Sequence, residues 1–81
     1  MVLALYTIPN CPYCKEAKIW LDKHKINYME VDVNESLRNK LYDLVQSDKL
    51  NFPIVNLGGK YFNGWFNKEQ LEEFKRILKI N

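Results

Sequence analysis

The segment VLALYTIPNCPYC, residues 2–14, joins a short apolar run to the chain's only two cysteines, Cys11 and Cys14. Residues 2–7 end before Pro9, which predicts a buried β-strand. Helical spacing begins directly after the cysteine pair, so the pair lies where a strand gives way to a helix. The first N–H groups of a helix lack partners within it and carry partial positive charge. We therefore expect Cys11 to ionise with a lowered pKa and to act as a nucleophile.

The size and composition of the chain favour one small folded domain. Its 81 residues, 47% of them hydrophobic, predict a single domain, 1–81, with a packed core. A disulfide between the two cysteines would close a very short loop and add little stability in the chain-entropy model. A purely structural or accidental pair is therefore a poor explanation of this motif. The 12 basic and 10 acidic residues balance closely, so we expect no nucleic-acid partner.

Compartment and membrane association are also constrained. No stretch is apolar enough and long enough to span a membrane, and no charged and apolar leader precedes the first strand. We therefore expect a cytoplasmic monomer in a reducing environment. There, paired cysteines usually bind metal or act in catalysis.

The rest of the chain is predicted to alternate between strands and helices. Strands are expected at residues 28–33, 53–57 and 60–62, with a tight turn at Gly58–Gly59. Asn34 and Asn67 suit the N-cap positions of a second and a third helix. The expected apolar faces are Ala17, Trp20, Leu21 and His24 in the first helix, Leu37, Leu41, Leu44 and Val45 in the second, and Leu71, Phe74 and Leu78 in the third.

The tetrad Cys11-Pro12-Tyr13-Cys14, the strand before it and the pair Phe52-Pro53 resemble the glutaredoxins of the thioredoxin-like superfamily. The resemblance covers nearly the whole chain. It implies an α/β fold of order βαβ-α-ββ-α, with a four-stranded mixed sheet flanked by helices. It also implies a cis bond before Pro53, where an isolated X-Pro bond would be trans.

The resemblance implies a thiol–disulfide oxidoreductase that uses glutathione as co-substrate. Cys11 would attack disulfides in proteins and in glutathione adducts, and Cys14 would be the buried resolving thiol. Pro12 and Tyr13 would shape the pair. Tyr13 would also face the substrate, the alternative being a surface aromatic at a helix start.

Glutathione would dock along the main chain of Phe52 beside Pro53, as an added strand. Residues 63–67 stand where glutaredoxins hold the γ-glutamyl end of glutathione. Gly64 matches that pattern, and Asn67 is either a polar contact or a plain N-cap. Trp65, like Phe66, either packs in the core or forms an exposed rim beside the sulfurs.

The sequence departs from the glutaredoxin pattern at two places. Asn63 replaces the first glycine of the turn, and Ile8 stands where the family usually carries a lysine for a glutathione carboxylate. Losing that cation should weaken binding by about 1 kcal/mol. Three cations could compensate or could be solvated surface charges: Arg38, Lys40 and Lys49.

Other functions remain open. Glutaredoxin-like hydrogen donors of ribonucleotide reductase are reduced by thioredoxin reductase, and Gly64-Trp65-Phe66 has a partial likeness to their Trp-x-Gly-Phe stretch. Some glutaredoxins carry an iron–sulfur cluster between two chains, in which Cys11 would ligate iron. A zinc site would need two further ligands, and only His24 and carboxylates remain. We expect no bound metal.

Overall fold

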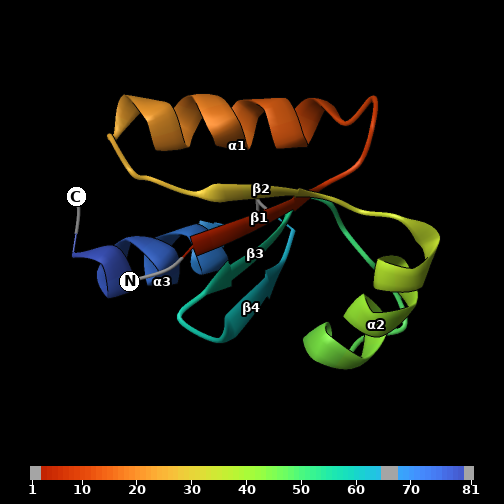
Figure 1. Cartoon of the computed structure of the whole chain (residues 1–81). Coiled ribbons are helices and arrows are strands. Elements are labelled where there is room, and N and C mark those ends of the chain that lie inside the picture. The colour runs from red at the N-terminus through yellow and green to blue at the C-terminus, as the bar shows by residue number, and fades with distance from the viewer. Residues whose placement is uncertain (1–2, 65–67, 80–81) are drawn as a thin grey trace.

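The computed structural model describes residues 3–64 and 68–79, and only the main chain of residues 68–71. Figure 1 shows its strands and helices in the order βαβ-α-ββ-α. The elements are β1 (Leu3–Thr7), α1 (Pro12–Lys23), β2 (Met29–Asp32), α2 (Glu35–Val45), β3 (Ile54–Leu57), β4 (Lys60–Asn63) and α3 (Lys68–Leu78).

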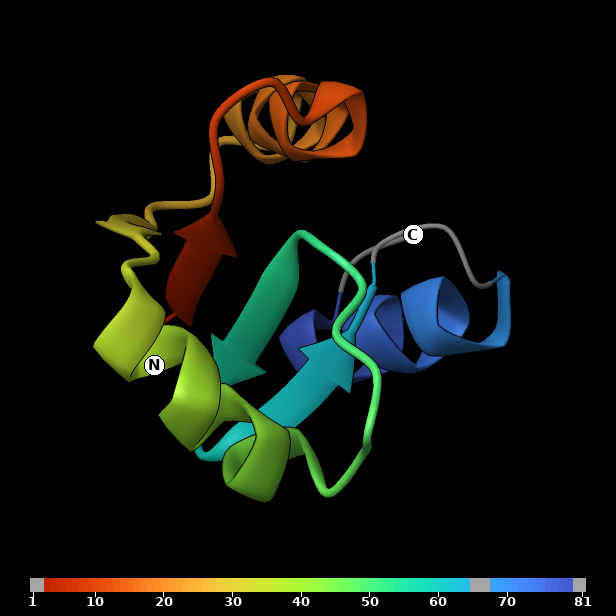
Figure 2. The same ribbon diagram turned by 90° about the vertical axis from the view of Figure 1, so that its right-hand side faces the viewer.

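The four strands form one mixed sheet in the order β2-β1-β3-β4. β1 runs parallel to β2 and antiparallel to β3, and β4 is antiparallel to β3. Helices α1 and α3 cover one face, and α2 lies on the other (Figures 1 and 2). The expected α/β architecture is therefore confirmed. No helix in the described ranges is long and apolar enough to cross a membrane.

The main core lies between the sheet and the helices α1 and α3. Leu5, Val55 and Phe62 are neighbours in the strand register and are all buried. They are joined by Ala17 and Leu21 of α1 and by Phe74 of α3. The apolar stripe expected in the first helix is confirmed for Ala17 and Leu21, which are fully buried, while Trp20 and His24 are half-buried.

The second helix buries a narrower face than its sequence suggests. Leu41 is fully buried, while Leu37 and Val45, four residues to either side, are half-buried. Leu44 was expected on this face but is 45% exposed, so that prediction is wrong. Residues four apart form one nearly straight row along a helix, and a residue three positions on lies at its flank.

Local signals at the ends of elements are confirmed where the structure describes them. The Asn34 side chain accepts a hydrogen bond of 2.8 Å from the Leu37 N–H and caps α2. Gly58 and Gly59 have φ of 60° and 93°, as the tight β3–β4 turn requires. The expected cap Asn67 lies outside the described residues, as does the side chain of Leu71.

An ion pair connects α1 to the edge strand β2. The Lys18 ammonium lies 2.6 Å from the Glu30 carboxylate, which also accepts a hydrogen bond of 3.1 Å from the Thr7 hydroxyl. The bond from Lys18, aided by the one from Thr7, lowers the pKa of Glu30, although partial burial opposes this. The same bond with Glu30 raises the pKa of Lys18.

This pair predicts a pH-dependent contribution to stability. The pKa of Glu30 is lower in the folded than in the unfolded protein. The ionised Glu30 therefore stabilises the fold at pH values above its pKa in the unfolded protein, and this stabilisation is lost as the pH falls through its pKa in the folded protein. We expect Glu30→Gln to reduce the free energy of unfolding at pH 7 by less than about 1 kcal/mol, because both side chains are more than a third exposed. Urea unfolding at pH 7 and pH 3 should show the difference shrinking in acid.

Glu16→Gln, at an exposed position of α1, is the matched control and should change little at either pH. A Glu30→Gln deficit that grows toward pH 3 would contradict this account.

Candidate active site

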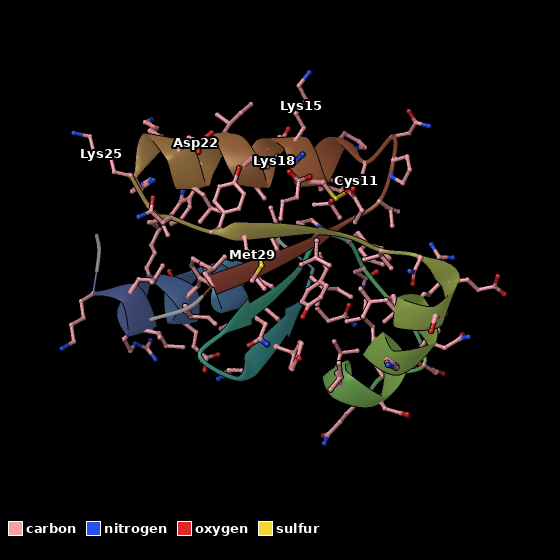
Figure 3. All side chains as sticks on the ribbon, viewed as in Figure 1. Cys11, Lys15, Lys18, Asp22, Lys25 and Met29 are labelled. Atoms are coloured by element: carbon pink, nitrogen blue, oxygen red, sulfur yellow. A yellow bond between two sulfur atoms is a disulfide. The ribbon has the colours of Figure 1, made fainter. Side chains whose placement is uncertain are left out.

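The two cysteines lie at the junction of β1 and α1. The structure joins them in a disulfide with a Cα–Cα distance of 5.3 Å, at the start of α1 in Figure 3. Cys11 is the N-cap residue and is half-buried, whereas Cys14, one turn into the helix, is only 3% exposed. A substrate disulfide can therefore approach Cys11 more easily than Cys14. The expected difference in burial is confirmed.

The start of α1 directs a main-chain donor at the Cys11 sulfur. The Cys14 N–H donates a hydrogen bond of 3.2 Å to Cys11 Sγ, which takes the place of a capping side-chain oxygen. Pro12 occupies the first helical position and has no N–H to satisfy. The first turn of α1, described in full, contains no acidic residue that would oppose a negative charge. This environment favours the thiolate form of Cys11.

The proline predicted to face the cysteines lies at the start of β3. The Phe52–Pro53 peptide bond is cis, as expected, and Pro53 is fully buried. Tyr6 pairs with Ile54, so extending this antiparallel register by one residue places Pro53 beside Thr7. The strand that leads to Cys11 is thus the neighbour of the segment that carries the cis bond.

One of the three candidate cations lies beside that segment. The guanidinium carbon of Arg38 is 5.8 Å from the centre of the Phe52 ring, which is a cation–π distance. Arg38 also lines a groove of about 590 Å³ together with Ile8. Arg38 therefore lies near the position where Ile8 replaces the usual lysine. Lys40 and Lys49 are exposed on the surface.

A second groove, of about 680 Å³, opens directly beside the sulfurs. It is lined by both cysteines and by the Lys18–Glu30 pair with Thr7. Lys15, at its rim, points away from the sheet in Figure 3. Polar and charged groups therefore border the disulfide on the β2 side.

In the described part of this site, metal ligands do not gather. Over residues 3–64 and the described side chains of α3, no three His, Cys, Asp or Glu residues cluster. The ring of His24, at the far end of α1, stacks on Trp20 with centroids 4.0 Å apart. Its Nδ1 lies 2.9 Å from the Trp20 carbonyl oxygen, so His24 packs and hydrogen-bonds at the C-terminal end of α1.

The turn after β4 is described only up to Gly64, so the expected contacts Trp65 and Asn67 lie outside the described residues. Asn63 makes contacts that were not predicted from the sequence. Its side chain accepts a hydrogen bond from the Asn51 N–H and donates one to the Lys49 carbonyl oxygen, both of 2.8 Å. The polar residue at a glycine position was the available signal, but nothing in the sequence pairs residue 63 with residues 49–51.

Comparisons with known proteins agree with this geometry. A family model described as Glutaredoxin matches residues 3–62. Glutaredoxin 1 of Rickettsia bellii is 32% identical over 85 residues, covering 96% of this chain and 84% of that protein.

Solved structures agree as well. Glutaredoxin 1 from Francisella tularensis, crystallised with cacodylate, is 28% identical with a TM-score of 0.67 and covers 95% of both chains. The solution structure of a Brucella melitensis glutaredoxin shares the fold at 23% identity, with a TM-score of 0.73 over 98% of this chain and 86% of that one. The chain belongs to the glutaredoxin family of thiol–disulfide oxidoreductases.

Proposed function

We propose that this protein is a cytoplasmic, monomeric, single-domain dithiol glutaredoxin that uses glutathione to reduce protein disulfides and glutathione mixed disulfides. The observation that carries the proposal is the hydrogen bond from the Cys14 N–H to Cys11 Sγ, together with the burial of Cys14. The bond favours an ionised, accessible attacking sulfur, and the burial withholds the second sulfur from solvent.

The reaction on a glutathione adduct needs only Cys11. Its thiolate attacks the glutathione sulfur, a Cys11–glutathione disulfide forms, and the target leaves as a thiolate that takes a proton from water. A second glutathione thiolate then attacks this disulfide. The attack falls on the glutathione sulfur of that disulfide, so oxidised glutathione is released and the Cys11 thiolate is restored.

The reaction on a protein disulfide needs both cysteines. Cys11 attacks one substrate sulfur and forms a mixed disulfide, while the other substrate sulfur leaves and is protonated. Cys14, after losing its proton, attacks Cys11 Sγ and expels the substrate sulfur that Cys11 had attacked, which leaves as a thiolate and takes a proton from water. The product is the Cys11–Cys14 disulfide present in this structure, which two glutathione molecules then reduce.

Glutathione is proposed to lie between the cysteines and the segment before β3. Its cysteine residue would pair with the main chain of Phe52 beside Pro53, with the ring of Tyr13, 55% exposed, along its flank. The γ-glutamyl end would meet Gly64 and the residues that follow it, Trp65 and Asn67. Arg38 would supply the cation that Ile8 lacks, since it lies beside Phe52.

A second candidate function has the same thiol–disulfide exchange at Cys11 and Cys14 but a different electron source. Ile8 lines the groove near Arg38 and offers no charge to a glutathione carboxylate. This favours, as the alternative, a hydrogen donor for ribonucleotide reductase that thioredoxin reductase reduces. An iron–sulfur carrier is the more distant alternative, with Cys11 as the iron ligand.

The electron source is tested by turnover of a small glutathione mixed disulfide, with the rate measured as the oxidation of NADPH by the coupled reductase. We expect rapid turnover with glutathione and glutathione reductase, and little with thioredoxin reductase alone. Turnover with thioredoxin reductase only would replace the glutathione assignment by the hydrogen-donor function. A coloured protein as purified, with weak turnover in both assays, would indicate the iron–sulfur carrier instead.

The cysteine roles predict two different losses. Cys11→Ser should abolish all exchange, whereas Cys14→Ser should keep turnover of glutathione adducts and lose most reduction of protein disulfides. In Cys14→Ser, alkylation of Cys11 followed against pH should show a midpoint below about 7.5, against about 8.5 for a free cysteine. Equal losses in both assays for Cys14→Ser, or a midpoint near 8.5, would refute these roles.

The position of Arg38 predicts a binding defect. Arg38→Met should raise KM for a glutathione adduct about fivefold, which corresponds to the loss of about 1 kcal/mol, and leave kcat within about twofold. Lys40→Met, at an exposed position of the same helix, is the control and should match the wild type. Equal KM values for the two variants would exclude Arg38 as the glutathione cation.

A further inference from the structure

The connection between α2 and β3 is held from the end of β4. Figure 2 shows this connection, residues 46–53, passing beside the end of β4 before it enters β3. Asn63, the last residue of β4, pairs with Ile54, the first residue of β3. The Asn63 side chain therefore starts next to the Phe52–Pro53 segment and reaches back along the connection.

Both polar atoms of the Asn63 amide bond to the main chain of this connection. Oδ1 accepts from the Asn51 N–H and Nδ2 donates to the Lys49 carbonyl oxygen, each at 2.8 Å. The two bonds need an acceptor and a donor on one short side chain. Aspartate offers only the acceptor and leucine offers neither. The residue at position 63 therefore determines how firmly residues 49–51 are held.

The main chain of Gly64 also lies close to Asn51 in this connection. Its φ is +106°, and a Cβ at this position would lie 3.3 Å from the Asn51 Cβ. The Asn63 amide and the Gly64 main chain thus both lie against Asn51, the residue directly before Phe52. Arg38 lies over the Phe52 ring. The segment presented to the substrate is contacted from β4 and from α2.

We propose that Asn63 is a positioning residue for substrate docking. By fixing residues 49–51 it sets the placement of the Phe52 main chain, on which a disulfide substrate lies in the proposed function. Asn63 bonds to the connection before β3, whereas the donor directed at the Cys11 sulfur comes from α1. Its loss therefore weakens substrate binding and leaves the reactivity of Cys11 unchanged.

The test compares Asn63→Asp and Asn63→Leu with the same changes at Asn27, an exposed residue before β2. We expect Asn63→Leu to raise KM for the substrate disulfide about tenfold and Asn63→Asp to raise it less, with kcat within about twofold. The rate of Cys11 alkylation against pH should match the wild type in all four variants. Amide hydrogen exchange at Asn51 should speed up about tenfold in Asn63→Leu and less in Asn63→Asp, which keeps the acceptor.

Each outcome decides the proposal. Faster exchange at Asn51 with an unchanged KM overturns it, and so does a loss confined to kcat or to Cys11 alkylation. If Asn63→Leu does not fold, the test uses Asn63→Asp alone, and a raised KM with an unchanged kcat is again the expected result. If the wild type accepts electrons only from thioredoxin reductase, KM is measured with that enzyme and a protein disulfide. The proposed electron source is then wrong. The role of Asn63 is still supported if its variants raise that KM, and is contradicted if the KM is unchanged.

Discussion

The hydrogen bond from the Cys14 N–H to Cys11 Sγ links the fold to the chemistry. It exists because β1 ends before Pro9 and α1 begins at Pro12, which leaves Cys11 as the N-cap residue. An N-cap position is normally filled by an oxygen side chain that satisfies a main-chain donor. With sulfur there, the Cys14 N–H points at Cys11 Sγ, where it would stabilise the negative charge of the thiolate that we propose as the nucleophile. The remainder of the sheet holds this junction and brings the start of β3, the proposed docking segment, beside it.

That second task depends on strand register. β1 is a central strand, with parallel β2 on one side and antiparallel β3 on the other. The end of β1 that leads to Cys11 therefore lies beside the start of β3, where Pro53 is buried. A shift of one residue would turn the inward residues of β3 away from the core. Burial of Val55 and Leu57 thus fixes the placement of Pro53 relative to Thr7.

Local sequence patterns predicted the positions of strands, helix starts and turns in this protein. They did not predict contacts between residues that lie far apart in the chain. The cysteine pair, the cap Asn34 and the turn glycines are signals contained within a few residues, and the structure has them as expected. Leu44 was placed wrongly because periodicity cannot tell how wide a helical face the sheet covers. Asn63 was missed because its partners lie 12 and 14 residues earlier in the chain. The cis bond was predictable only through the family resemblance.

The departures from the family pattern have a common consequence. At position 8 a cation is replaced by an apolar side chain, and at position 63 a glycine is replaced by an amide. The first removes a charge from the groove that Ile8 lines with Arg38, and the second adds hydrogen bonds that hold residues 49–51, next to the proposed docking segment. An ordered docking surface loses less conformational entropy when substrate binds, so it can recover affinity that a missing charge removes. Recognition would then rely on the fixed placement of the Phe52 main chain together with the charge that we propose Arg38 to supply.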